Sequence, residues 1–165
     1  MRAREFILED RMAGIDIDQA IAKTPPAWQQ WIKSLPEQLA REMIDERPNP
    51  DSQDIQFYAP LRLTRPQPIE VSVAQLLQNP ANQYAVSNVP QEITAAVNKN
   101  YGTNITNSGK VYDQNPGRYQ QYAQMPANTA SPSVLVNGEI HFGVGRFVAA
   151  ALRGDKSIRA WDLRG

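Results

Sequence analysis

The chain has 165 residues, no cysteine and a formal net charge of zero. This excludes disulfides, thiolate metal sites, cysteine nucleophiles and a global electrostatic attraction to nucleic acid. No apolar run approaches the roughly 18 residues of a membrane span, and the charged opening MRAREFILEDRM lacks the apolar core of a secretory signal. We therefore expect a cytoplasmic protein that makes no membrane contact, with one main core and a small appendage.

The charge is unevenly distributed along the chain. Residues 1–51 hold 7 basic and 10 acidic side chains, whereas residues 139–165 hold 5 basic and 3 acidic ones. This pattern fits either an ordinary solvated surface or a modest positive face around Arg146.

Residues 1–50 are predicted to form a helical arm. Asp16 is an N-cap residue for a helix over 17–23, and Pro26 suits the first turn of the next helix. Ser34 and Glu37 have the spacing of a capping box for a third helix, which the prolines of 47–51 end. The apolar stripes of the last two helices comprise Trp28, Trp31, Ile32, Leu35, Leu39, Ala40, Met43 and Ile44.

The tryptophan pair Trp28 and Trp31 has the i, i+3 spacing of one helix face. Such a pair is either internal packing or a base-stacking platform. If both rings were exposed in one apolar patch, the N-terminal helices would be a surface for a protein partner.

The main domain is predicted to cover 51–165. Residues 51–68 read as irregular, with short strands at 57–59 and 61–63. Apolar and polar residues alternate over 69–73, which predicts a half-buried strand, and a short helix over 74–78 follows.

The segment 79–130 is rich in Asn, Gln, Tyr and Pro, but structureless loops of this length are uncommon inside domains. We expect a helix over 90–100 that ends at Gly102, and a second over 116–124. Residues 102–114 read as an exposed, mobile loop without the phosphate-binding loop pattern of Walker-type proteins.

The clearest pattern lies between residues 131 and 165. A buried strand over 134–136 leads into Asn137-Gly138, a strong hairpin signal, and alternation places Ile140 and Phe142 on one face of the returning strand. A helix follows with an apolar stripe and ends at Gly154. The residues of that stripe are Val144, Phe147, Val148, Ala151 and Leu152. A last strand directs Ile158, Ala160 and Leu163 inward.

The turn Gly143-Val144-Gly145-Arg146 begins that helix. A helix start offers free backbone N–H groups and the positive end of the helix dipole, so it attracts anions. Arg146 in the first turn is unfavourable for the helix alone, by a few tenths of a kcal/mol. An anion between the guanidinium and the dipole would account for it; the alternative is an ion pair with Glu139.

The same residues resemble the ParB/sulfiredoxin fold. The family pattern PPIVV-x-x-G-x-I-x-D-G-H-H-R-x-x-A-A corresponds here to PSVLVNGEIHFGVGRFVAA, residues 132–150. The strand and helix over 69–78 resemble the family's first strand and helix. The opening MRAREFI also resembles proteins of marine tailed phages, which would place the protein in the host cytoplasm.

The resemblance implies an α+β fold with a small mixed sheet flanked by helices. It also implies a phosphate held by Gly143, Val144, Gly145 and Arg146, as part of a nucleotide (ATP, ADP or CTP) with Mg²⁺ or of a nucleic acid. Phe142 stands where many members carry an acid, and Gly145 where they carry His, Arg or Cys. Sulfiredoxin activity is excluded because the chain lacks cysteine. The nuclease-like and kinase-like members use acid–base side chains that Phe142 and Gly145 do not provide.

Other candidates for chemistry are few. His141, the only histidine, suits general-base catalysis or is a surface residue, and Glu70 is either a metal ligand and base or a solvent-facing carboxylate. No Asp/Glu/His cluster has metal-ligand spacing. The remaining basic residues of interest are predicted to be surface charges: Arg118, Arg153, Lys156 and Arg159.

Three functions follow from these residues. The first is a ParB-like domain that binds a nucleotide or nucleic-acid phosphate with weak or no hydrolysis. The second is an inert structural or interaction protein of phage type, and the third is a metal-dependent nuclease that uses Glu70 or His141. Fold resemblance does not choose among them.

Overall fold

The computed structural model describes residues 14, 16–126 and 130–165. The chain divides into two compact units, the first reaching Gln67 and including Leu163–Gly165, the second covering Pro68–Asp162. Helices and a five-stranded sheet make the fold α+β, as predicted. No helix in the described ranges combines the length and the apolar character that a bilayer crossing requires.

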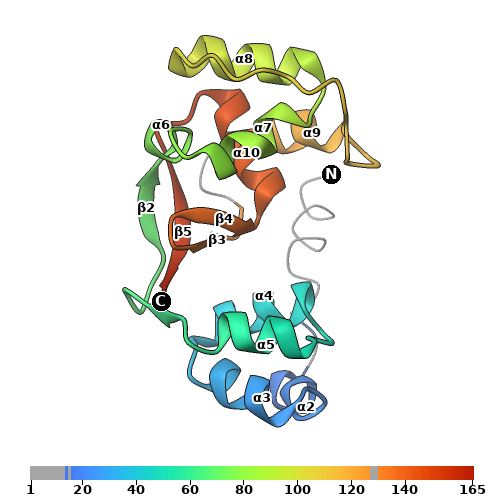
Figure 1. Cartoon of the computed structure of the whole chain (residues 1–165), viewed down its shortest axis with the longest axis vertical. Helices are drawn as coiled ribbons and strands as arrows, with labels where there is room; N and C mark the ends of the chain where they lie inside the picture. Colours follow the sequence, from blue (N-terminus) through green and yellow to red (C-terminus); the bar gives the residue numbers. More distant parts are fainter. Residues whose placement is uncertain (1–13, 15, 127–129) are drawn as a thin grey trace. The chain divides into compact units, whose positions relative to one another are not determined.

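The first unit is mainly helical (Figure 1). Its elements are α2 (Ile17–Ala22), α3 (Pro26–Lys33), α4 (Glu37–Glu46), α5 (Ser52–Tyr58) and the short strand β1 (Arg62–Leu63). Strand β1 pairs antiparallel with the end of β5 (Ser157–Arg164), so that Arg62 lies opposite Arg164 and Leu63 opposite Leu163.

An aromatic cluster forms the centre of this unit. The side chains of Trp28, Trp31 and Tyr58 are 0%, 4% and 3% exposed, and the ring centroids of the two tryptophans lie 4.9 Å apart. The indole N–H of Trp31 donates to the carbonyl of Leu61 at 3.0 Å. The tryptophan pair is therefore internal packing, and the interpretations as an exposed platform or exposed partner patch are wrong.

Two local predictions in the first unit are wrong. Residues 57 and 58 end helix α5 rather than form a strand, because Asp51 and Asp54 cap the start of α5 reciprocally, side chain to backbone, at 2.8 and 3.2 Å. Ser34 does not cap α4, since its hydroxyl donates to the carbonyl of Trp31 at the end of α3.

The second unit contains a mixed arrangement of helices around a sheet (Figure 1). Its elements are β2 (Ile69–Ser72), α6 (Val73–Leu76), α7 (Pro80–Ser87), α8 (Gln91–Tyr101), α9 (Arg118–Ala123), β3 (Ser133–Val136), β4 (Glu139–Phe142), α10 (Val144–Arg153) and most of β5. The strand order here is β2-β5-β3-β4. Helix α7 was not predicted, whereas the other elements lie within two residues of their expected bounds.

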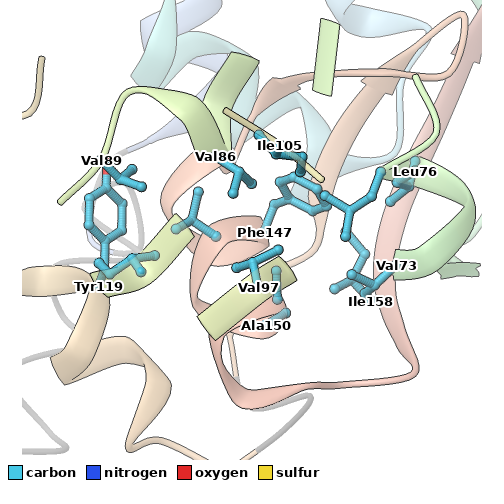
Figure 2. Packing of buried hydrophobic residues seen from close by; sticks show 14 of the residues in the cluster. Val73, Leu76, Val86, Val89, Val97, Ile105, Tyr119, Phe147, Ala150 and Ile158 are labelled. Carbon is cyan, nitrogen blue, oxygen red and sulfur yellow. The ribbon is translucent and has the colours of Figure 1, made fainter. Parts of the chain in front are cut away.

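The core of the second unit surrounds α10, which packs against α6, α7, α8 and α9 and against the hairpin of β3 and β4. Phe147 is fully buried at its centre, with Val86, Val97 and Ile105 around it (Figure 2). The predicted apolar stripe is thus confirmed. Gly154 ends α10 with φ of 80°, as its position predicted.

Asparagine side chains hold the Asn-rich segment to the core. Asn82 is 2% exposed, donates to the carbonyls of Leu76 and Gly138 at 3.0 Å each, and accepts from the amide of Ile140 at 2.9 Å. Asn98 accepts from the amide of Ile105 and donates to its carbonyl, both at 2.9 Å.

The loop over 102–114 is largely exposed but is not a free loop. Ile105 is part of the core, and Asn107 donates to the carbonyl of Val89 and the hydroxyl of Thr94. Ser108 donates to the side chain of Asn88. The predicted exposure is confirmed for most of the loop, whereas residues 105–108 are anchored to the core because amide side chains replace the missing secondary-structure hydrogen bonds.

The hairpin turns at Asn137 and Gly138, with φ of 50° and 85°, as predicted. Phe142 lies opposite Val134 and Ile140 opposite Leu135, so His141 is an extra residue in a β-bulge. Consecutive residues of β3 point to opposite faces, so Ile140 and Phe142 do too. The prediction that they share a face is therefore wrong.

Asn82 is expected to be a large contributor to stability. Asn82→Ala removes three hydrogen bonds to buried or half-buried backbone groups, of which only the carbonyl of Leu76 keeps another partner, the amide of Asn79. We therefore expect the free energy of unfolding to fall by about 2–4 kcal/mol. The control is Asn104→Ala, at an exposed position, where we expect a change within about 0.5 kcal/mol. Urea unfolding followed by circular dichroism measures both, and equal effects would contradict the role of Asn82.

Candidate functional site

The start of α10 is a tight backbone turn at Gly143, where φ is 78°. A β-carbon built there would lie 2.6 Å from the hydroxyl oxygen of Ser133 and 3.0 Å from two nitrogens of Arg146. The Ser133 hydroxyl donates to the carbonyl of Gly143 at 3.1 Å. Glycine is therefore required at this position for two reasons: the positive φ, and the close approach of the Ser133 and Arg146 side chains.

Arg146 folds back over this turn toward the chain that enters β3. Its Nη1 donates to the carbonyls of Ser131 and Pro132 at 2.8 and 3.1 Å. Glu139, the alternative ion-pair partner, instead lies 3.8 Å from Nε2 of His141. The arginine thus connects the start of α10 to the segment before β3.

A small pocket lies beside Arg146, with a volume of about 40 Å³. Three half-buried arginines line it: Arg146, Arg153 and Arg159. Three serines contribute hydroxyl groups: Ser131, Ser133 and Ser157. Among the described residues of the lining, Asp155 provides the single carboxylate. The prediction that Arg153 and Arg159 are surface charges is wrong, because both turn into this pocket.

Arg153 is held rigidly. Its Nε lies 3.2 and 3.0 Å from the two carboxylate oxygens of Asp155, and its Nη2 lies 2.7 Å from one of them. Its Nη1 donates to the carbonyl of Tyr122 at 2.8 Å. This bidentate pair fixes one guanidinium at the pocket and ties α9 to the end of α10.

Glu70 lies next to the pocket through strand pairing. It stands directly opposite Arg159 in the antiparallel pair of β2 and β5. Its Oε2 accepts a hydrogen bond from the hydroxyl of Ser157, a lining residue, at 2.6 Å. Arg159 itself donates to the carbonyl of Ala130 at 3.0 Å.

Of the four predicted cradle residues, Arg146 lines the pocket and Gly143, Val144 and Gly145 do not. Gly145 faces α9 instead, since a β-carbon there would lie 3.6 Å from the ring of Tyr122 and 3.9 Å from that of Tyr119. The position before the arginine is therefore used for helix packing.

Glu70 and His141 are not brought together. They lie on β2 and β4, the two edges of the sheet in this unit, with β5 and β3 between them. Three strand spacings of about 4.8 Å separate these edges by about 14 Å. The described residues also contain no group of three or more His, Asp or Glu side chains placed to hold a metal.

Arg153 and Arg159 are the site residues that sequence reasoning missed. Arg146 and Arg153 are seven residues apart in one helix, which places them on the same side two turns apart. This spacing could have indicated from the sequence that Arg153 lies on the same side of the helix as Arg146. The sequence carries no comparable signal for Arg159, which reaches the pocket through the position of β5. Arg118 pairs with Asp113, and Lys156 is exposed.

Comparison of the chain with known proteins identifies no relative that could assign a function to this site. No family model matches the chain, and neither a curated protein nor a solved structure is significantly similar to it.

The turn at Gly143 is testable by substitution. In Gly143→Ala both the strained φ and the contact with Ser133 oppose the new methyl group, so we expect a loss of at least about 2 kcal/mol. Gly109 has nearly the same φ, 76°, with no atom within 4 Å of a built β-carbon. Gly109→Ala should therefore cost only about 1 kcal/mol. Urea unfolding of both variants separates the cost of the contact with Ser133 from the cost of the positive φ. Equal losses of unfolding free energy would contradict a contribution from the contact.

Tyr101 is expected to make stability sensitive to alkaline pH. Its hydroxyl donates to the carbonyl of Asp155 at 2.6 Å, and burial together with the charge of Asp155 raises its pKa to about 12. Because the folded-state pKa is raised from 10.0, the contribution is complete below pH 10 and is lost as pH rises toward 12.

We expect the stability of the wild type to fall more steeply between pH 10 and 12 than that of Tyr101→Phe. Denaturant unfolding at a series of pH values measures both slopes. Parallel curves would show that Tyr101 ionises equally in the folded and unfolded chains.

Proposed function

We propose that the second unit is a ParB-like domain that binds a phosphate group of a nucleotide or nucleic acid. The observation that carries this proposal is the pocket in which Arg146, Arg153 and Arg159 meet, with three serine hydroxyls around them. Arginine forks and hydroxyl groups are the donors that recognise phosphate oxygens. The lining has three cationic groups against one carboxylate, so its formal charge favours an anion.

The size of the pocket supports a single phosphate group as the part that enters. A volume of about 40 Å³ is close to the space of one or two waters. A base or sugar would remain outside. ATP, ADP and CTP, with Mg²⁺ on their outer phosphates, are the ligands that the family resemblance implies. A terminal or exposed phosphate fits this pocket better than a whole nucleotide.

The arrangement favours binding over hydrolysis. Phosphoryl transfer needs a group that activates water beside the phosphate. Asp155 lines the pocket but is paired with Arg153, and Glu70 beside the pocket accepts a hydrogen bond from Ser157. His141 lies at the other edge of the sheet. Gly145, where relatives of the family carry a functional side chain, is covered by tyrosine rings. We therefore propose weak or absent hydrolysis and do not favour a nuclease.

Titration calorimetry with ATP, ADP, CTP and inorganic phosphate, with and without Mg²⁺, tests this proposal. We expect binding to the wild type and at least a tenfold loss in Arg159→Gln and Arg146→Gln, since each removes a charged hydrogen-bond donor worth about 1.5–3 kcal/mol. Lys110→Gln removes one exposed positive charge elsewhere in the unit and is the matched control.

Circular dichroism checks that each variant is folded, because Arg146 also bonds two backbone carbonyls. Absence of binding to the wild type, or equal weakening by Lys110→Gln, would overturn the proposal.

A further inference from the structure

A serine and a carboxylate make a short contact beside the pocket that Arg146, Arg153 and Arg159 line. The hydroxyl of Ser157 donates to Oε2 of Glu70 at 2.6 Å. Ser157 is half-buried and belongs to the lining, whereas Glu70 is exposed next to it. A carboxylate at this distance from a hydroxyl is placed to accept its proton, which is the arrangement of an activated serine nucleophile.

Strand pairing brings these two groups together. Strands β2 and β5 are antiparallel, with Ser72 opposite Ser157 and Glu70 opposite Arg159. Opposed residues share a face of the sheet, and so do residues two positions apart in one strand. Glu70, Ser157 and Arg159 therefore lie on one face, while Ile158 between the last two is buried in the core. The strand backbones hold the carboxylate and the hydroxyl in place.

Two nearby serines differ from Ser157 in what their hydroxyls contact. Ser133 also lines the pocket, but its hydroxyl donates to the carbonyl of Gly143, which accepts a hydrogen bond without taking up the proton. The hydroxyl of Ser72 accepts from the amide of Gln75 at 3.2 Å, and Ser72 lies outside the lining. Of these three serines, Ser157 is the one that donates to a carboxylate.

The pocket also supplies what phosphoryl transfer requires besides a nucleophile. Catalysis of that reaction depends on positioning and on cations that stabilise the charge of the transferred group. Arg159 stands two residues from Ser157 on the same face of β5, and Arg146 lines the same small pocket. Because Glu70 is hydrogen-bonded to Ser157, the acceptor that it can activate is this hydroxyl and not water.

We propose that Ser157 accepts the terminal phosphoryl group of a nucleoside triphosphate, so that the chain phosphorylates itself. This step rests on the proposed function, because the pocket must first hold that phosphate. The Ser157 oxygen forms a bond to the γ-phosphorus, and the bond from the γ-phosphorus to the β–γ bridging oxygen breaks. The nucleoside diphosphate leaves with the electron pair of that bond. Glu70 takes the hydroxyl proton of Ser157 and releases it to solvent.

The reaction takes place once in each chain, because it consumes Ser157. It is therefore compatible with weak or absent hydrolysis. The new phosphate carries a charge of about −1.5 to −2 near pH 7. It stays beside the arginines of the pocket, where it takes the place of the terminal phosphate of a nucleotide. Phosphorylation of Ser157 thus closes the pocket to a second nucleotide.

Incubation of the full chain with ATP and Mg²⁺, followed by mass spectrometry of the intact protein and of its peptides, tests this inference. We expect one added phosphoryl group at Ser157, at a rate that does not depend on protein concentration. Ser157→Ala should gain none. In Glu70→Gln an oxygen can still accept the hydrogen bond but cannot take the proton, so we expect a rate at least about 100-fold lower.

Ser72→Ala is the matched control, since Ser72 stands opposite Ser157 but outside the lining, and we expect the wild-type rate. Calorimetry with the β,γ-imido analogue of ATP measures binding without transfer, and circular dichroism checks the fold of each variant. Binding without phosphorylation of Ser157, phosphorylation of another serine instead, or an unchanged rate in Glu70→Gln would overturn the inference and leave the proposed function standing. Absence of binding to the wild type would overturn both.

Discussion

Burial of the middle of α10 is the constraint on which the second unit depends, since five consecutive residues from Phe147 to Ala151 are buried. Phe147 is fully buried, and the alanines that follow it let the neighbouring helices approach closely. This helix can begin where it does because Gly143 adopts a positive φ beneath the side chains of Ser133 and Arg146. The same turn that starts the core helix therefore positions the first arginine of the candidate site.

Polar side chains complete what helices and strands leave unpaired. Asn82 links the end of α6 to the hairpin turn, and Asn98 holds the start of the loop after α8. Tyr101 performs the same role at the end of α10, through the carbonyl of Asp155. These bonds satisfy buried or half-buried backbone groups outside the regular hydrogen-bond pattern of helices and strands. The second unit thus keeps a long stretch with little regular secondary structure closely packed.

The candidate site is a product of this packing. Arg153 is clamped by Asp155 and the end of α9, while Arg159 enters from β5 and Arg146 from the start of α10. Three cations gathered at one pocket favour an anion there.

The sequence by itself determined the elements whose signals are local. The Asn137-Gly138 turn, the stripe of α10 and the glycine ends of α8 and α10 depend on neighbouring residues, and all were predicted. Arg146 was found because it lies at a helix start. Only the tertiary structure decided the bulge at His141, the burial of Trp28 and the convergence of Arg153 and Arg159. These depend on strand register and on contacts between residues far apart in the chain, for which short-range periodicity carries no information.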